Sequence, residues 1–326
     1  MLIDVHTHIV PASFPPGPAS GTATRWPCLC HHGDGRAVIE FAGKPYRELD
    51  QRSWEVARRL EDMEREGIAA QALSPMPELL SYWLDAAPAL ELNRWINHAL
   101  AEMVARAPGR FHALGCVPLQ DIELATRELA RLKADGFAGV EIGSNINGAM
   151  PGEARFDPFY AEAERLDLAI FVHALHPVGV DRVAAWPDLV PFANFPLDTG
   201  LAAATLIRAG VPERYPRLRL GFSHGGGAIA SLAARLAQGW RLSQRFGGTL
   251  AASPTTIAAG FYYDSLVYDA GYLDYLAGSF APGQVFAGTD YPYVIQQEGL
   301  QAFLDGTTTC GGELTTVAAR RFLGLG

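Results

Sequence analysis

The sequence predicts a (β/α)8 TIM barrel, a closed ring of parallel strands with helices outside it, with an inserted lid segment after the first strand. Short apolar runs alternate with longer helical patterns, which is typical of βα units and a parallel sheet. About eight such runs follow one another, and eight parallel strands close into a barrel. A chain of 326 residues is a usual length for one barrel, so we expect residues 1–326 to form a single domain.

Each expected helix carries apolar residues at helical spacing, and each expected strand is a short apolar run. In residues 54–67, for example, Val56, Leu60 and Met63 form one stripe and Gly67 ends the helix. In residues 157–166, Asp157 is expected to be the N-cap and Pro158 the first helical residue. In chain order the expected elements are strand 2–5, helix 54–67, strand 68–73, helix 87–106, strand 113–118, helix 122–135, strand 139–142, helix 157–166, strand 169–173, helix 201–209, strand 218–223, helix 229–244, and strands 262–264 and 285–288.

Residues 11–46 or so interrupt this pattern. The segment is rich in proline and glycine and shows little periodicity, so we expect a long loop that covers the barrel mouth as a lid. It contains Cys28, Cys30, His31 and His32. The cysteines are one residue too close for a zinc knuckle and no second pair follows, so loop residues that face the barrel mouth are the favoured interpretation.

Composition excludes several classes of protein. Hydrophobic residues make up 49% and charged residues 19%, which fits a large buried core. The net charge of -9 argues against a nucleic-acid partner. No apolar run reaches the roughly 18 to 20 residues that span a bilayer, so no membrane partner is expected. The N-terminus does not resemble an export signal, and four cysteines are too few for a disulfide framework, so we expect a cytoplasmic protein.

Histidine and aspartate side chains follow several of the expected strands. His6 and His8 alternate on one strand, so both rings can reach a common point, although by themselves they could equally be loop residues that touch solvent. His173, His224 and Asp290 each stand where an apolar run ends. In a β/α barrel these strand ends converge at the face where catalytic residues lie.

These residues suit a divalent cation. Ions such as zinc accept imidazole and carboxylate together, and a catalytic site keeps one position open for water or substrate. His6, His8, His173 and Asp290 can provide such a site. Zinc is the favoured ion, and manganese can use the same residues.

The motifs DVHTH, FVHALHP, FSHGGG and GTDYP, in this order, resemble the amidohydrolase-related family, in the branch of aminocarboxymuconate-semialdehyde decarboxylase and aromatic-acid decarboxylases. The resemblance extends over nearly the whole chain. It implies His6, His8, His173 and Asp290 as metal ligands and His224 as the catalytic acid and base. It also implies that Arg47 and Arg235 contact a substrate carboxylate, with Arg235 reaching into the neighbouring subunit of a homodimer.

Two features limit what the resemblance implies. After the fifth strand the chain has His173-Ala-Leu-His176-Pro, where a decarboxylase of the family it resembles has His-Pro-Trp, and this difference leaves the substrate open. The additional His176 could bind a substrate group or merely the backbone. Many amidohydrolases hold two metals through a carboxylated lysine on the fourth strand, but the only lysines here are Lys44 and Lys133, outside that strand. We therefore expect one metal ion, although Glu141 on that strand could also act as a bridging carboxylate.

The sequence thus leads to one favoured function and two alternatives. The favoured hypothesis is a metal-dependent non-oxidative decarboxylase that acts on a small unsaturated or aromatic carboxylic acid of a catabolic pathway. A hydrolase or hydratase acting on a ring-cleavage product or lactone would use the same metal and histidine. A non-catalytic metal-binding protein is the third hypothesis, and His224 beside a complete ligand set argues against it.

Overall fold

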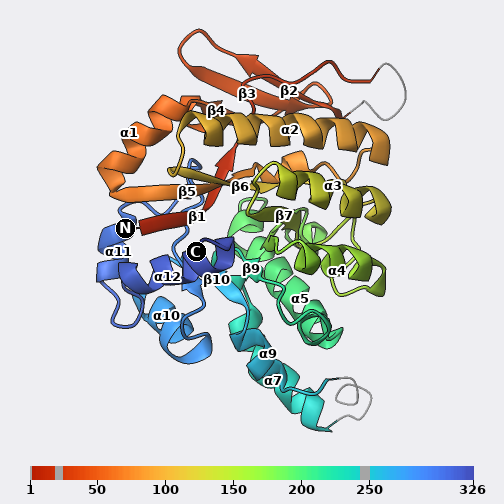
Figure 1. Cartoon of the computed structure of the whole chain (residues 1–326), viewed down its shortest axis with the longest axis vertical. Coiled ribbons are helices and arrows are strands. Elements are labelled where there is room, and N and C mark those ends of the chain that lie inside the picture. The colour runs from red at the N-terminus through yellow and green to blue at the C-terminus, as the bar shows by residue number, and fades with distance from the viewer. Residues whose placement is uncertain (1, 19–24, 243–249) are drawn as a thin grey trace.

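The computed structural model describes residues 2–18, 25–242 and 250–326 and contains the expected barrel (Figure 1). Eight parallel strands form one sheet, in an order that follows the sequence. Parallel bridges from Asp4 to Ala287 and from Thr7 to Tyr291 join its first strand to the chain after its last strand and nearly close the ring. The strands are β1 (Leu2–Ile9), β5 (Ile68–Pro75), β6 (Phe111–Gly115), β7 (Gly139–Gly143), β8 (Ala169–His173), β9 (Leu220–Phe222), β10 (Tyr262–Asp264) and β11 (Val285–Phe286).

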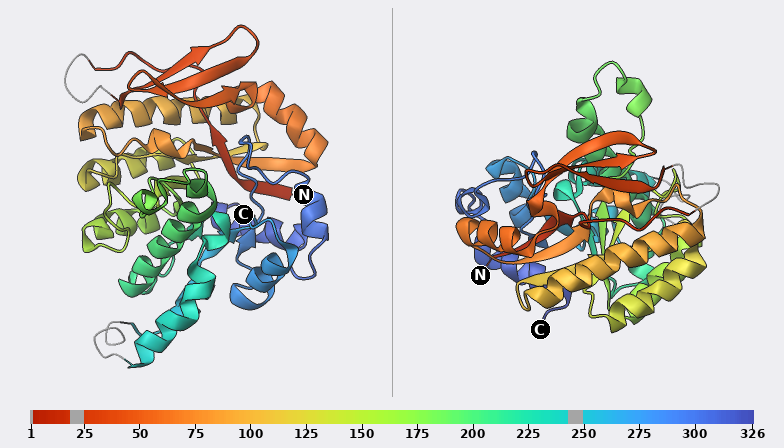
Figure 2. Two further views of the ribbon diagram at one scale, coloured as in Figure 1. Left: turned by 180° about the vertical axis from the view of Figure 1, so that it is seen from behind. Right: turned by 90° about the horizontal axis from the view of Figure 1, so that it is seen from above.

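Helices alternate with the strands and surround the barrel (Figure 2). In α1, Gly67 ends the helix in the left-handed conformation, with a φ of 70°, as expected from its position. The helices are α1 (Val56–Glu66), α2 (Ala86–Arg106), α3 (Ile122–Ala134), α4 (Asp157–Arg165), α5 (Phe195–Arg208), α6 (Val211–Arg214), α7 (Ile229–Leu242), α9 (Pro254–Ala259), α10 (Ala270–Tyr275), α11 (Leu300–Asp305) and α12 (Gly312–Leu323).

Two apolar clusters stabilise this arrangement. The larger one lies between the barrel and its helices. The smaller one fills the barrel interior with inward residues of the strands, and α12 contributes to it. Phe322 of α12 lies 4.9 Å from Phe286 and 6.4 Å from Phe171, measured between ring centroids. The barrel interior is therefore packed with apolar side chains below the level where the metal-type residues lie.

The segment after β1 forms a sheet, so the expectation of a structureless loop was wrong. Strands β2 (Pro27–His31), β3 (Arg36–Phe41) and β4 (Lys44–Asp50) pair in antiparallel fashion, and the sheet lies at one edge of the molecule beside α2 (Figures 1 and 2). Ala37, Ile39 and Phe41 alternate along β3 and are buried. This period of two is the signature of a half-buried strand. The sheet ends at Asp50, beyond the expected boundary, and its role as a lid stays a prediction.

Two further details differ from the expected elements. Helix α5 begins at Phe195, six residues earlier than expected. Asp157 is the first residue of α4 rather than its N-cap, and its carboxylate accepts a hydrogen bond from Arg214 at 2.5 Å. The expected end of α7 at residue 244 lies outside the described residues.

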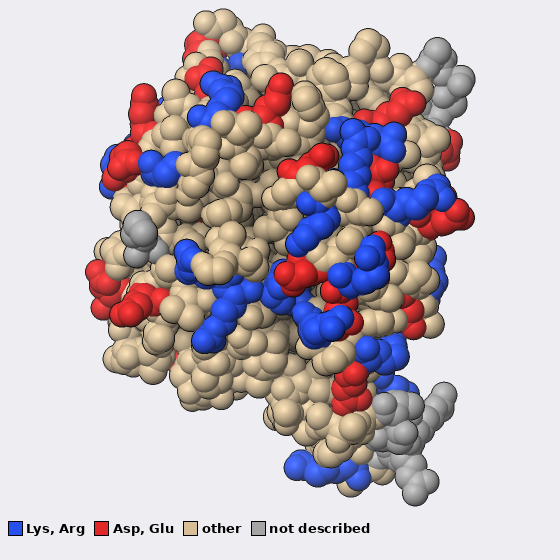
Figure 3. Space-filling model, viewed as in Figure 1, with Lys and Arg blue, Asp and Glu red and all other residues tan. Residues whose placement is uncertain are grey.

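The outer surface gives no sign of a single-charge face on the side drawn in Figure 3, where basic and acidic side chains are interspersed. Among the described helices, none combines the length and the apolar character needed to cross a bilayer. Helices α7 and α9 project from the barrel at the end far from the three-stranded sheet (Figures 1 and 2).

Candidate metal centre and active site

Four buried side chains meet at the C-terminal end of the barrel. His6 and His8 come from β1, His173 ends β8, and Asp290 follows β11. One ligand atom of each lies within 4.8 Å of the others. The Nε2 atom of His8 lies 3.1 Å from Nε2 of His6 and 3.0 Å from Oδ1 of Asp290. The structure therefore brings together the four residues that were expected to bind a metal.

The three imidazoles are held with Nε2 toward this centre. In each ring Nδ1 lies against an oxygen atom that can only accept, so the neutral ring carries its proton on Nδ1 and offers the lone pair of Nε2. Outer partners of this kind orient metal-binding histidines. The partners are Oδ2 of Asp264 at 2.6 Å from His6, the carbonyl of Pro75 at 3.0 Å from His8, and the carbonyl of Ala174 at 2.8 Å from His173.

Two atoms of the centre lack a hydrogen bond. Nε2 of His173 and Oδ1 of Asp290 are buried and have no hydrogen-bond partner among the described residues. A buried polar atom without a partner costs roughly 1–3 kcal/mol, so such a pair calls for a ligand. A divalent cation would satisfy both atoms, and the donor set fits it.

The charges at the centre also favour a bound cation. Burial lowers the pKa of His8 and of His173, so both rings are neutral as metal ligands must be. Burial opposes ionisation of Asp290, but the neighbouring rings of His6 and His8 hold the pKa of Asp290 well below its ordinary value. Despite burial, Asp290 and Asp264 raise the pKa of His6 to about 9. The carboxylates thus attract positive charge to this point.

Asp264 organises the centre, and the sequence analysis gave it no role. It is fully buried at the end of β10 and accepts four hydrogen bonds. These come from Nδ1 of His6 at 2.6 Å and the backbone amide of His224 at 2.9 Å on Oδ2, and from the amides of Gly225 at 2.6 Å and Leu266 at 3.2 Å on Oδ1. Like the ligands, it closes an apolar strand, which is the signal that could have identified it.

His224 lies beside the ligand set but outside it. Its ring centroid is 5.1 Å from that of His173 and 5.5 Å from that of His6. Its backbone has a φ of 57°, and Nδ1 lies 3.1 Å from Oγ of Ser223. Burial, together with the positive charge of His6, lowers the pKa of His224 to about 4. The imidazole is therefore neutral near pH 7 and can accept a proton.

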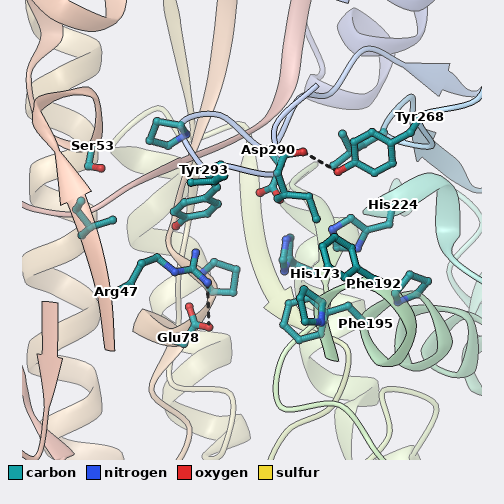
Figure 4. Close-up of a pocket in the computed structure, with 18 of the residues that line it drawn as sticks. Arg47, Ser53, Glu78, His173, Phe192, Phe195, His224, Tyr268, Asp290 and Tyr293 are labelled. Atoms are coloured by element: carbon teal, nitrogen blue, oxygen red, sulfur yellow. Dashed lines mark hydrogen bonds and ion pairs between the residues drawn. The ribbon is translucent and has the colours of Figure 1, made fainter. Parts of the chain in front are cut away.

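A cavity of about 950 Å³ opens over the centre (Figure 4). His173, His224 and Asp290 line one side, and Arg47 enters from β4 on the other. The guanidinium carbon of Arg47 lies 4.3 Å from the centroid of the Tyr293 ring. Phe and Tyr side chains contribute to the remaining wall, and with Arg47 they suit a flat or unsaturated molecule with an anionic group; they are Phe192, Phe195, Tyr268, Tyr272 and Tyr293.

The structure does not bring Arg235 or His176 to this cavity. Arg235 is exposed on the projecting helix α7. His176 is exposed after β8, and its ring centroid lies 5.3 Å from that of Trp83. Their roles as substrate contacts stay predictions, and the role of Arg235 requires a second subunit.

The structure also places the residues that were considered for a second metal, Glu141, Lys44 and Lys133. Glu141 is buried on β7, with Oε2 3.7 Å from Nδ1 of His8, on the side of that ring away from Nε2. It is not part of the set of converging ligand atoms, and burial raises its pKa to about 8. Lys44 lies on β4 and Lys133 on α3, so neither reaches the barrel interior.

The cysteine pair in the insertion lies on a strand rather than in a loop. Cys28 and Cys30 are on β2 with their sulfur atoms 3.9 Å apart, and Cys28 is exposed. His31 places Nε2 2.7 Å from the carbonyl of Ala12. Among the described residues, no metal-type cluster includes Cys28, Cys30, His31 or His32.

Comparison with known proteins identifies the family. A family model described as "Amidohydrolase" matches residues 3–325. The chain belongs to this amidohydrolase family. Within it, the chain is 32% identical over 331 residues to 2-amino-3-carboxymuconate-6-semialdehyde decarboxylase of Dictyostelium discoideum, covering 99% of this chain and 91% of that relative. The predicted resemblance is thereby confirmed.

Solved structures of the family share the fold. The 2,6-dihydroxybenzoate decarboxylase from Rhizobium superposes with a TM-score of 0.77 at 21% identity, covering all of this chain and 99% of the other. Dihydroxybenzoic acid decarboxylase from Polaromonas sp. JS666, solved with bound manganese and an inhibitor, has a TM-score of 0.71 at 23% identity and covers 82% of this chain and 85% of the other. The barrel is therefore the family's scaffold.

Proposed function

We propose that this chain is a metal-dependent non-oxidative decarboxylase that acts on an unsaturated or aromatic carboxylic acid of a catabolic pathway. One observation carries the proposal: the three Nε2 atoms and Asp290 converge beside His224 in a cavity that also receives Arg47. The decarboxylase of Dictyostelium discoideum that is 32% identical over 99% of this chain supports it.

We propose one divalent cation, held by His6, His8, His173 and Asp290. Zinc suits three imidazoles and one carboxylate, and manganese binds in the related decarboxylase from Polaromonas sp. JS666. When bound, such an ion polarises substrate oxygens and stabilises negative charge. Metal analysis of protein grown with zinc, and of protein grown with manganese, identifies which ion the purified protein retains.

The chain's own residues account for binding and proton transfer. The guanidinium of Arg47 can bind the substrate carboxylate through two parallel hydrogen bonds and so fix its orientation. When carbon dioxide leaves, the electron pair of the broken carbon–carbon bond stays on the substrate carbon, and a proton must replace the carboxylate. His224 is neutral at rest. It therefore takes up a proton from the solvent first and then donates that proton to the carbon.

We also propose a homodimer, in which Arg235 reaches the cavity of the partner. Arg235 is exposed on the projecting α7 and does not line the cavity of its own chain. A substrate contact by Arg235 would therefore be made in the cavity of a second copy. All four cysteines are free, which supports a reducing compartment such as the cytoplasm.

The test is a screen of metal-loaded protein against muconate semialdehydes, hydroxybenzoates and lactones, with carbon dioxide and absorbance followed together. Release of carbon dioxide in equal amount to the acid consumed supports the proposal. A change in absorbance without carbon dioxide would replace it with the hydrolase or hydratase alternative. No turnover while the metal is retained would indicate a metal-binding protein without this activity.

A further inference from the structure

A buried arginine connects the segments that carry the metal-type residues. Arg59 lies on α1, which packs against β5 (Figure 1), and its long side chain is fully buried. It does not line the cavity, and the proposed mechanism gives it no role. Its contacts therefore have to show what it does.

The guanidinium group of Arg59 binds the end of β1. Nη2 donates a hydrogen bond to the carbonyl of His8, and Nη1 donates one to Oγ1 of Thr7 at 3.2 Å. Nη1 also donates to Oε1 of Gln71 on β5 at 3.2 Å, and Nε donates to the carbonyl of Arg52 at 3.3 Å. Because the guanidinium group is a rigid fork of donors, it joins β1, β5 and the turn before α1 at fixed separations.

The pairing of β1 with β5 is irregular at the same place. Asp4 pairs with Gln71 and Thr7 pairs with Leu73, so three steps along β1 match two steps along β5. The irregular stretch includes His6. An extra residue of this kind bends the strand, changes the direction of side chains and interrupts regular pairing. The bonds of the guanidinium group therefore help to fix the part of β1 that carries the metal-type histidines.

The same guanidinium group reaches the segment that carries Asp290. Its central carbon lies 4.8 Å from the centroid of the ring of Tyr291, the next residue in the chain, which is within the range of a cation–π contact. The carbonyl of Tyr291 accepts a hydrogen bond from the amide of His8 at 2.7 Å. The hydroxyl of Tyr291 donates to Oδ2 of Asp62 at 2.8 Å. Since Arg59 and Asp62 both lie on α1, this helix holds both ligand-bearing segments.

The bonds of Arg59 give its charge little compensation. All four go to neutral oxygen atoms, two of them carbonyls, one a hydroxyl and one a side-chain amide. Removing a charge from water costs free energy that neutral partners offset only in part, so this residue is a poor choice for stability alone. A positive charge also disfavours a cation nearby. The metal centre can therefore benefit from the bonds of Arg59 but not from its charge.

We propose that Arg59 is a positioning residue of the metal centre, which fixes His8 directly and Asp290 through Tyr291. It acts through the chain segments that carry the ligands, since its bonds go to the carbonyl of His8 and not to the ring. This inference rests on the metal centre of the proposed function and does not depend on the reaction.

The experiment measures the affinity of the metal-free protein for zinc, by competition with a chelator, in the wild type and in Arg59→Met. Methionine keeps an unbranched apolar chain but has no hydrogen-bond donor. Loss of a partner that orients metal ligands lowers metal affinity by about 10- to 100-fold, and we expect a loss of this size. Removal of a positive charge alone would strengthen cation binding, so the direction of the change separates positioning from charge.

Two further measurements separate positioning from a purely structural role. The visible absorption of bound cobalt(II) reports ligand geometry, and it should differ between Arg59→Met and the wild type. Arg59→Lys keeps the charge but replaces the fork with a single ammonium group, so it should also lose zinc affinity. A residue that only stabilises the fold would leave the zinc affinity and the cobalt spectrum of the folded protein unchanged.

Arg110→Met is the matched control. Arg110 also donates to strand carbonyls, those of Ala69 at 2.6 Å and Ile68 at 3.3 Å, but at the opposite end of β5 from the metal centre. This variant should unfold at a lower temperature than the wild type and keep its zinc affinity. Thermal unfolding of the metal-free proteins checks that each variant is folded.

Several results would overturn the proposal. They are a zinc affinity within about threefold of the wild type in a folded Arg59 variant, an equal loss of affinity in Arg110→Met, and failure of both Arg59 variants to fold, which would make Arg59 structural. A wild type that binds no zinc would reject the metal centre itself. The expected loss of affinity in a protein that releases no carbon dioxide would reject the decarboxylase and keep the positioning role.

Discussion

Replacing Asp264 with asparagine tests whether this carboxylate organises the metal centre. Asp264 accepts hydrogen bonds from four donors, two on each oxygen. An amide has one oxygen and one NH2 group, so whichever way it turns, the NH2 group faces two donors. Turning the oxygen toward His6 and His224 leaves the amides of Gly225 and Leu266 unpaired.

The size of the effect follows from these contacts. Two unpaired backbone amides at about 1–3 kcal/mol each lower the free energy of unfolding by about 2–6 kcal/mol. The neutral amide also holds the Nδ1 proton of His6 less firmly than the carboxylate, whose Oδ2 lies 2.6 Å away. Loss of such an outer partner lowers metal affinity by about 10- to 100-fold.

Metal affinity is measured by competition with a chelator, and stability by urea unfolding of the metal-free protein. Asp4→Asn is the matched control, because Asp4 is an equally buried carboxylate whose hydrogen bonds go to Thr289 and to the backbone of His6 rather than to its ring. Burial already raises the pKa of Asp4 to about 7, so this carboxyl is partly neutral near pH 7 and replacing it with asparagine changes its charge only in part. A folded Asp264→Asn protein whose metal affinity stays within about threefold of the wild type would refute the reasoning.

Three other predictions concern the site residues. Asp290→Ala and His173→Ala should each abolish metal binding and activity, since a three-ligand remnant loses both geometry and affinity; retained metal at one ion per chain in either variant would show a different ligand set. His224→Asn should keep the metal but lower turnover about 100-fold or more; loss of the metal would instead make His224 a ligand. Mixing inactive Arg235→Ala and His224→Ala chains should restore about a quarter of wild-type activity, because half of the randomly paired dimers are hybrids with one complete site. No recovery after confirmed subunit exchange would show that Arg235 does not act across the interface.

Much of the barrel could be predicted because its strands are local apolar runs. Strand β8 begins and ends where the pattern placed it, at Ala169 and His173. The four candidate ligands could be predicted for the same reason, since each follows an apolar run in the sequence, and barrel topology brings the ends of such runs together.

What escaped prediction depends on contacts between distant segments. The strand character of β3 lies in only three alternating apolar residues within a segment rich in glycine and proline, so composition outweighed periodicity. Asp264 closes a strand of three residues, and only the fold shows that it meets the ring of His6, 258 positions away in the sequence. The same holds for Arg59, whose hydrogen bond to the carbonyl of His8 joins residues 51 positions apart.

The most direct test of a single catalytic metal is a titration of the metal-free protein with zinc or manganese, with the initial rate of carbon dioxide release measured at each addition. One ion held by His6, His8, His173 and Asp290 predicts a rate that rises linearly and levels off at one ion per chain. A rate that levels off at two ions per chain, or carbon dioxide release that is independent of added metal, would contradict the account.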